Sequence, residues 1–168
     1  MKRWFLFFII PMGIILIGLL FLRSRNANRS IQQHKSPDIK NSPFHKEYLS
    51  KGGITVVNVW ATWCQPCVEE IPVFQKIATE NNHIKFVFLS LDEDQKKLEM
   101  FLTKHPINDI TFKNKEYIET IKTFLGGNGV MGYSVIPQTF IIKDGKVVDK
   151  SIGGIDYQNF TDKLKSFY

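Results

Sequence analysis

The pattern of apolar and polar residues between residues 44 and 168 predicts an alternation of strands and helices. Residues 54–60 (ITVVNVW) are β-branched and mostly apolar over the length of a strand, which predicts a strand buried in a sheet. From about residue 64 to about residue 81, apolar residues recur at helical spacing with polar residues between them. The same reading predicts a second parallel strand at 84–91, a helix at 95–104, a hairpin of strands 139–142 and 146–152, and a closing helix at 157–167. This part of the chain has the size of one ordinary domain.

The first 43 residues have a different pattern and form no part of the predicted core. Residues 4–22 contain no charge, lie between basic residues and are long enough to span a bilayer, so we expect residues 1–22 to form an uncleaved transmembrane anchor. Cleavage near Ala27 is the alternative. Residues 23–43 are polar and almost free of apolar residues, which predicts a solvated tether to the domain at 44–168.

The distribution of charge argues against nucleic-acid binding, the function that a high isoelectric point first suggests. Residues 1–51 hold nine of the 22 Lys and Arg residues and two of the 16 Asp and Glu residues, a net charge of +7. Residues 52–168 hold 13 basic and 14 acidic residues, a net charge of −1. Because the predicted domain has no net basic charge to pair with phosphates, we expect no nucleic-acid partner.

Both cysteines of the chain, Cys64 and Cys67, lie in the stretch WATWCQPC at residues 60–67. A closed zinc site would need further Cys or His ligands, and the four histidines are scattered without ligand spacing. Covalent haem attachment would need a histidine directly after the second cysteine, where the chain has Val68. A static disulfide closing so short a loop would stabilise the fold weakly, whereas a redox-active dithiol uses this spacing well.

The predicted elements place Cys64 at the N-terminus of a helix that follows a buried strand. The free backbone N–H groups and the helix dipole there favour a thiolate, so we expect Cys64 to be exposed, to have a lowered pKa and to act as the nucleophile. Cys67 lies one turn deeper. From there it is placed to attack a mixed disulfide on Cys64 and release the product.

Two motifs resemble those of a known family. Residues 60–67, followed by VEEIP at 68–72, resemble the active-site segment of the thioredoxin superfamily, specifically its membrane-anchored TlpA/ResA-like branch. Residues 135–145 (VIPQTFIIKDG) resemble the family's loop with a cis-proline and the strand that follows it. The resemblance implies an α/β thioredoxin fold, a central mixed sheet flanked by helices, with an N-terminal transmembrane helix. It also implies that Pro137 is cis and lies beside the dithiol, and that the backbone of Ile136 pairs with the substrate.

Other residues near the two motifs are candidates for the site. We expect Trp63 and Pro66 to contact substrate together with Ile136 and Pro137, while Trp60, at the end of the buried strand, is assigned to the core. Many cytosolic thioredoxins carry a buried aspartate where this chain has Asn58, which cannot titrate. Glu70 matches a glutamate of the ResA-like branch and is the third candidate catalytic residue beside Cys64 and Cys67; the alternative is a solvated helix face.

One further motif is assigned no function. Gly127–Gly132 (GNGVMG) matches G-x-G-x-x-G, which in a nucleotide-binding fold follows a strand and opens a helix. Here it precedes Pro137 and a strand, so we expect a flexible loop and not a nucleotide site.

These observations predict a thiol-disulfide oxidoreductase that needs no cofactor and reduces disulfides of exported proteins. The resemblance implies apocytochrome c or another exported cysteine protein as substrate, and a membrane thiol relay as electron donor. It also implies that residues 4–22 lie in the bilayer and that the catalytic domain faces the periplasm or the cell exterior, where disulfides persist. The alternatives are a disulfide-forming oxidant of the same fold, a Cu(I)-binding module that uses the two thiolates, and a docking domain with an inert disulfide.

Overall fold

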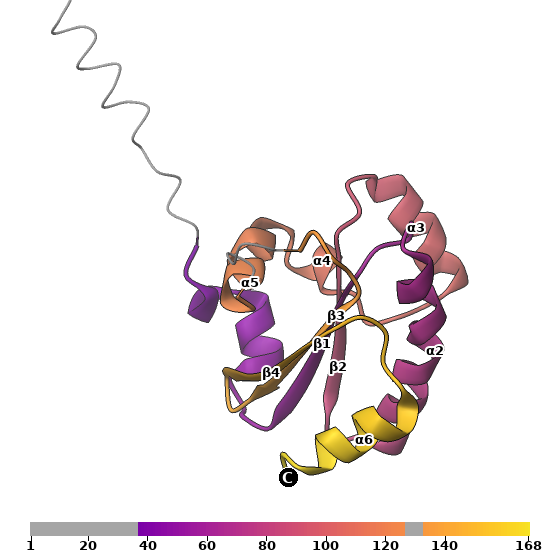
Figure 1. Cartoon of the computed structure of the whole chain (residues 1–168). Helices are drawn as coiled ribbons and strands as arrows, with labels where there is room; N and C mark the ends of the chain where they lie inside the picture. Colours follow the sequence, from indigo (N-terminus) through magenta and orange to yellow (C-terminus); the bar gives the residue numbers. More distant parts are fainter. Residues whose placement is uncertain (1–36, 127–132) are drawn as a thin grey trace, which may run out of the picture. The chain divides into compact units, whose positions relative to one another are not determined.

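The computed structural model describes residues 37–126 and 133–168, which form a four-stranded sheet with helices on both faces (Figure 1). The strands are β1 (Ile54–Trp60), β2 (Lys85–Ser90), β3 (Gln138–Lys143) and β4 (Lys146–Ile152). The α-helices are α2 (Gln65–Glu80), α3 (Gln95–Lys104), α4 (Ile110–Lys113), α5 (Ile118–Phe124) and α6 (Tyr157–Lys165). Short helical turns are η1 (Ile39–Asn41), η2 (His45–Leu49) and η3 (Lys115–Tyr117).

The sheet is mixed, with the strand order β2-β1-β3-β4. β1 pairs in parallel with β2 and antiparallel with β3, while β3 and β4 form an antiparallel hairpin. All seven residues of β1 are buried, which agrees with its run of β-branched and apolar side chains. The loop that follows β1, and the two cysteines, therefore lie at the C-terminal end of a central strand.

Side chains of β1 alternate between two cores, one on each face of the sheet. Ile54, Val56 and Trp60 pack with α2, α3 and α6, whereas Val57 and Val59 pack with η2, α4 and α5. Figure 1 shows α2 and α6 on one side of the sheet and α5 on the other. The packing of apolar faces from both sides gives the sheet the layered architecture that the resemblance implies.

The predicted strands and helices are confirmed within two residues at each end. The sequence predicts no element between residues 105 and 126, where the structure has α4, η3 and α5. These helices have only four, three and seven residues, too short for an apolar repeat to identify them. Their caps and their packing on the sheet hold them: the Asp109 carboxylate accepts hydrogen bonds from two backbone N–H groups of α4.

The predictions for the N-terminal segment concern residues that lie mostly outside the described part of the chain. The expected anchor at 1–22 lies outside the described residues. The G-x-G-x-x-G segment at 127–132 lies outside them as well. Across residues 37–126 and 133–168, no helix has the length and apolar character needed to cross a membrane. Pro37, in the range assigned to the tether, contacts the domain, since its carbonyl accepts a hydrogen bond from the Thr120 hydroxyl at 3.0 Å.

Candidate active site

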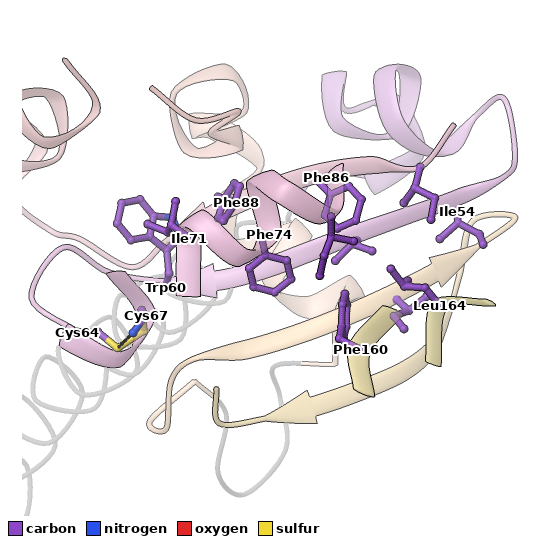
Figure 2. Packing of buried hydrophobic residues seen from close by; sticks show 14 of the residues in the cluster. Ile54, Trp60, Cys64, Cys67, Ile71, Phe74, Phe86, Phe88, Phe160 and Leu164 are labelled. Carbon is purple, nitrogen blue, oxygen red and sulfur yellow. Dashed lines mark hydrogen bonds between the residues drawn. A yellow bond between two sulfur atoms is a disulfide. The ribbon is translucent and has the colours of Figure 1, made fainter. Parts of the chain in front are cut away.

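The two cysteines lie where β1 passes into α2, and a disulfide joins them (Figure 2). Cys64 is the N-cap of α2, and its Sγ accepts a hydrogen bond from the backbone N–H of Cys67 at 3.3 Å. Pro66 lies in the first turn of the helix, where its missing N–H costs no hydrogen bond. The geometry places a sulfur at the positive end of a 16-residue helix, the position that favours a thiolate once the disulfide is reduced.

Cys64 is less accessible than the sequence analysis expected. It is 7% exposed in the disulfide form, against 0% for Cys67, and both sulfur-bearing residues belong to the core cluster that includes Trp60 and Ile71. Figure 2 shows the disulfide at the end of this cluster. The order of depth is as predicted: Cys64 is the outer sulfur and Cys67 the inner one.

Glu70, the third candidate catalytic residue, is buried, so the alternative of a solvated helix face is wrong. Cys67 and Glu70 belong to the same buried stripe of α2, one turn apart. Both carboxylate oxygens accept hydrogen bonds: Oε1 from Asn58 Nδ2 at 2.7 Å and Oε2 from the backbone N–H of Ile155 at 3.1 Å. Burial raises the pKa of Glu70 to about 7, although these two hydrogen bonds act to lower it. The chain thus holds a buried carboxyl group with a raised pKa one turn of α2 after Cys67.

Asn58 meets Glu70 because of its place on β1. It lies between Val56 and Trp60 on the face of the sheet that α2 covers, and it is 1% exposed. Its Nδ2 also lies 3.3 Å from the hydroxyl oxygen of Thr139, the residue paired with it on β3. The sequence analysis identified Asn58 only as a residue that cannot titrate. The structure shows it to be the hydrogen-bond donor to the one buried carboxylate on α2.

The Ile136–Pro137 peptide bond is cis, as the resemblance implies. Pro137 is buried, and its carbonyl oxygen accepts a hydrogen bond from the backbone N–H of Gly153 at 2.9 Å. Ile136 is half-buried and packs against the cluster that contains the two cysteines. Within the described residues, the backbone N–H and C=O of Ile136 have no hydrogen-bond partner. Among the residues that the structure describes, the backbone groups of Ile136 are therefore unpaired, and its side chain packs against the cluster that contains the dithiol.

Trp63 and Pro66 are both exposed around the disulfide. Trp63 is 69% exposed, in contrast to fully buried Trp60, whose assignment to the core is confirmed. Among the described residues, Trp63 has the most exposed large apolar side chain. Its place directly before Cys64 puts an exposed aromatic side chain next to the disulfide in the chain.

Two residues that form hydrogen bonds to the site from distant parts of the chain are not identified from the sequence. The Ile155 N–H bonds Glu70 from a position 85 residues away, and Asp92 bonds Thr62 from 30 residues away. No local motif marks either residue, because the contacts depend on how the strands and helices pack.

Comparisons with known proteins agree with this geometry. A family model described as thioredoxin-like matches residues 52–147. The thiol-disulfide oxidoreductase ResA of Bacillus anthracis is 31% identical over 104 residues, which cover 61% of this chain and 57% of that relative. The thiol:disulfide interchange protein DsbE of Pseudomonas fluorescens biotype C is 25% identical over 181 residues, covering 100% of this chain and 95% of the relative.

Solved structures agree at the level of the fold. The thiol:disulfide interchange protein of Chlorobium tepidum TLS is 26% identical and superposes with a TM-score of 0.56, covering 70% of this chain and 81% of that one. StoA from Bacillus subtilis, 20% identical, superposes with a TM-score of 0.51 over 67% of this chain and 83% of that one. The motifs, the mixed sheet and the family match all agree. The chain belongs to the thioredoxin-like family.

Proposed function

We propose that this protein is a thiol-disulfide oxidoreductase that reduces disulfides of exported proteins. The observation that carries the proposal is the Cys64–Cys67 disulfide at the N-terminus of α2, one turn before the buried carboxyl group of Glu70. The names of the ResA and DsbE relatives, which describe oxidoreduction and interchange of thiols and disulfides, support the same chemistry.

The reaction begins from the reduced protein and transfers two electrons to the substrate. The Cys64 thiolate attacks one sulfur of the substrate disulfide, which forms a mixed disulfide and releases the first substrate thiolate. Cys67 then loses its proton and attacks Cys64 Sγ, which breaks the mixed disulfide and releases the second substrate thiolate. The protein is left with the Cys64–Cys67 disulfide, the state seen in the structure. A dithiol donor must return two electrons and two protons before the next cycle.

The substrate is a polypeptide in this proposal. Exposed Trp63 and Pro66 border the dithiol, and the free backbone groups of Ile136 beside Pro137 suit pairing with an extended chain. The class of substrate is an exported cysteine protein such as apocytochrome c, and the electron donor is a membrane thiol relay.

An insulin-reduction assay on the reduced protein tests the proposed function. With dithiothreitol as donor, the protein should make turbidity from the precipitating insulin B chain appear sooner than dithiothreitol alone does, and this acceleration should be absent when Cys64 is replaced by alanine. A Cu(I) titration of the same preparation serves as the competing measurement. Stoichiometric Cu(I) binding without insulin reduction would replace the proposal with a Cu(I)-binding module, and a measured potential in the range of strong oxidants would reverse its direction.

The proposed location is the cell membrane, with the domain outside the cytoplasm. Residues 4–22 would cross the bilayer once as an uncleaved anchor, and the polar residues from 23 onward would hold the domain away from the surface. A reporter enzyme that is active only after export, fused after Tyr168, should be active in the membrane fraction. A domain protected from added protease in intact spheroplasts would place it in the cytosol and contradict the exported substrate.

A further inference from the structure

The turn between β1 and α2 is anchored to β2 by a single carboxylate. Residues 61–63 form this turn, and the Cys64 N–H closes it by donating to the Ala61 carbonyl at 3.1 Å. The backbone N–H of Thr62 donates to Asp92 Oδ2 at 2.8 Å, and the Thr62 hydroxyl donates to Asp92 Oδ1 at 2.5 Å. Both hydrogen-bond donors of Thr62 thus bind one side chain, which lies two residues after the end of β2.

Asp92 is itself held in place by the end of β2. The Ser90 hydroxyl donates to Asp92 Oδ2 at 2.6 Å, and the Asp92 N–H donates back to Ser90 Oγ at 2.9 Å. The Leu91 N–H donates to the Trp60 carbonyl at 2.8 Å, and the Ser90 N–H donates to Thr111 Oγ1 at 3.0 Å. The Asp92 carboxylate therefore accepts three hydrogen bonds, two from Thr62 and one from Ser90. A carboxylate can serve all three donors because both of its oxygens are acceptors.

We propose that Asp92 is a positioning residue for the attacking thiol. By holding Thr62, it keeps the N-terminus of α2 at the end of β1, where Cys64 Sγ lies 3.3 Å from the Cys67 N–H. That N–H and the helix terminus stabilise the Cys64 thiolate only while this geometry is kept. The inference rests on the proposed function in assigning attack to Cys64.

Loss of Asp92 has two effects on the Cys64 thiolate, and they have opposite signs. Removal of a nearby negative charge favours the thiolate, whereas release of the turn weakens its contact with the helix terminus and disfavours it. In the proposal the second effect is larger. The pKa of Cys64 therefore rises when Asp92 is replaced, and this direction cannot come from the charge change alone.

The test measures the pKa of Cys64 in the full chain through the pH dependence of alkylation by iodoacetamide. A Cys67→Ser background leaves Cys64 as the only thiol in the chain. Asp92→Ala should raise the pKa by about half a unit, the size of a helix-terminus interaction. Thr62→Val, which removes only one hydroxyl contact, should raise it less, and the double variant should show no larger shift than Asp92→Ala alone. Thr62→Ser keeps the hydroxyl, so its Cys64 pKa should equal that of the Cys67→Ser background.

Asp94→Ala is the matched control. Asp94 lies two residues further along, where its carboxylate caps α3 by accepting from the backbone N–H groups of Lys96 and Lys97 at 3.1 and 3.2 Å. This substitution should lower the melting temperature without changing the pKa of Cys64. An unchanged or lowered pKa in Asp92→Ala, or an equal shift in Asp94→Ala, overturns the proposal. Because alkylation reports on Cys64 itself, the result is independent of whether the protein reduces insulin, and failure of the proposed function would appear only in the insulin assay.

Discussion

Replacement of Cys67 by serine should trap the protein in a covalent mixed disulfide between Cys64 and its substrate. Cys64 is the outer sulfur at the N-cap of α2, so it can still attack, but no inner thiolate remains to release the product. Turnover should fall by at least about a thousandfold, because an intramolecular thiol of high effective concentration is lost. Non-reducing electrophoresis and mass spectrometry of the adduct measure the trapped species.

Cys64→Ser is the partner variant in the same experiment. It should form no adduct, because Cys67 is fully buried and cannot reach a substrate disulfide. If the adduct accumulates with Cys64→Ser and not with Cys67→Ser, the roles of the two sulfurs are exchanged.

Replacement of Glu70 by glutamine should slow product release by at least about tenfold and leave the attack by Cys64 nearly unchanged. Cys67 must lose its proton before it attacks the mixed disulfide, and Glu70 lies one turn along the same buried stripe of α2. A positioned general base typically contributes a hundredfold or more, directly or through a water molecule. Stopped-flow single turnovers resolve the two steps. In the unaltered protein, release should accelerate as the pH rises through about 7, where Glu70 ionises, and this inflection should be absent from Glu70→Gln.

The same variant also changes how stability depends on pH in the oxidised protein. The pKa of Glu70 is about 7 in the folded state, against 4.5 for an ordinary glutamate, because burial disfavours the charged form. The folded state therefore binds the proton more tightly than the unfolded state does. The resulting stabilisation is fully present below about pH 4.5 and is lost as the pH rises through about 7. Relative to Glu70→Gln, the unaltered protein should lose on the order of 3 kcal/mol across this range in urea unfolding.

Glu69→Gln is the matched control for both measurements. Glu69 is the exposed neighbour on the same helix, and its carboxylate accepts a hydrogen bond from Gln65 Nε2 at 2.9 Å. It should show the release rate and the pH profile of the unaltered protein. Equal slowing in Glu69→Gln and Glu70→Gln would indicate a general effect of charge on the helix, and release at the normal rate in Glu70→Gln would give Glu70 a purely structural role.

Residues 54–104 show how much of the fold the sequence predicts. The β-branched run of β1 predicts a buried strand, and the apolar period of α2 predicts a helix. The structure confirms both. The short helices between residues 110 and 124 were not predicted, because each has too few residues for a repeat. Their positions depend on packing against the sheet, which no local pattern contains.

The sequence by itself determined that the two cysteines lie at a helix N-terminus after a buried strand, because those properties depend on neighbours in the chain. The tertiary structure decided the environment of each group in the site. Glu70 is buried because α2 packs its stripe against the sheet, and its pKa depends on Asn58 from β1 and Ile155 from the segment before α6. Asp92 meets Thr62 because parallel pairing of β1 and β2 brings the ends of both strands to one edge of the sheet. Burial and cross-strand hydrogen bonds are properties of the packed chain, so local sequence alone could not supply them.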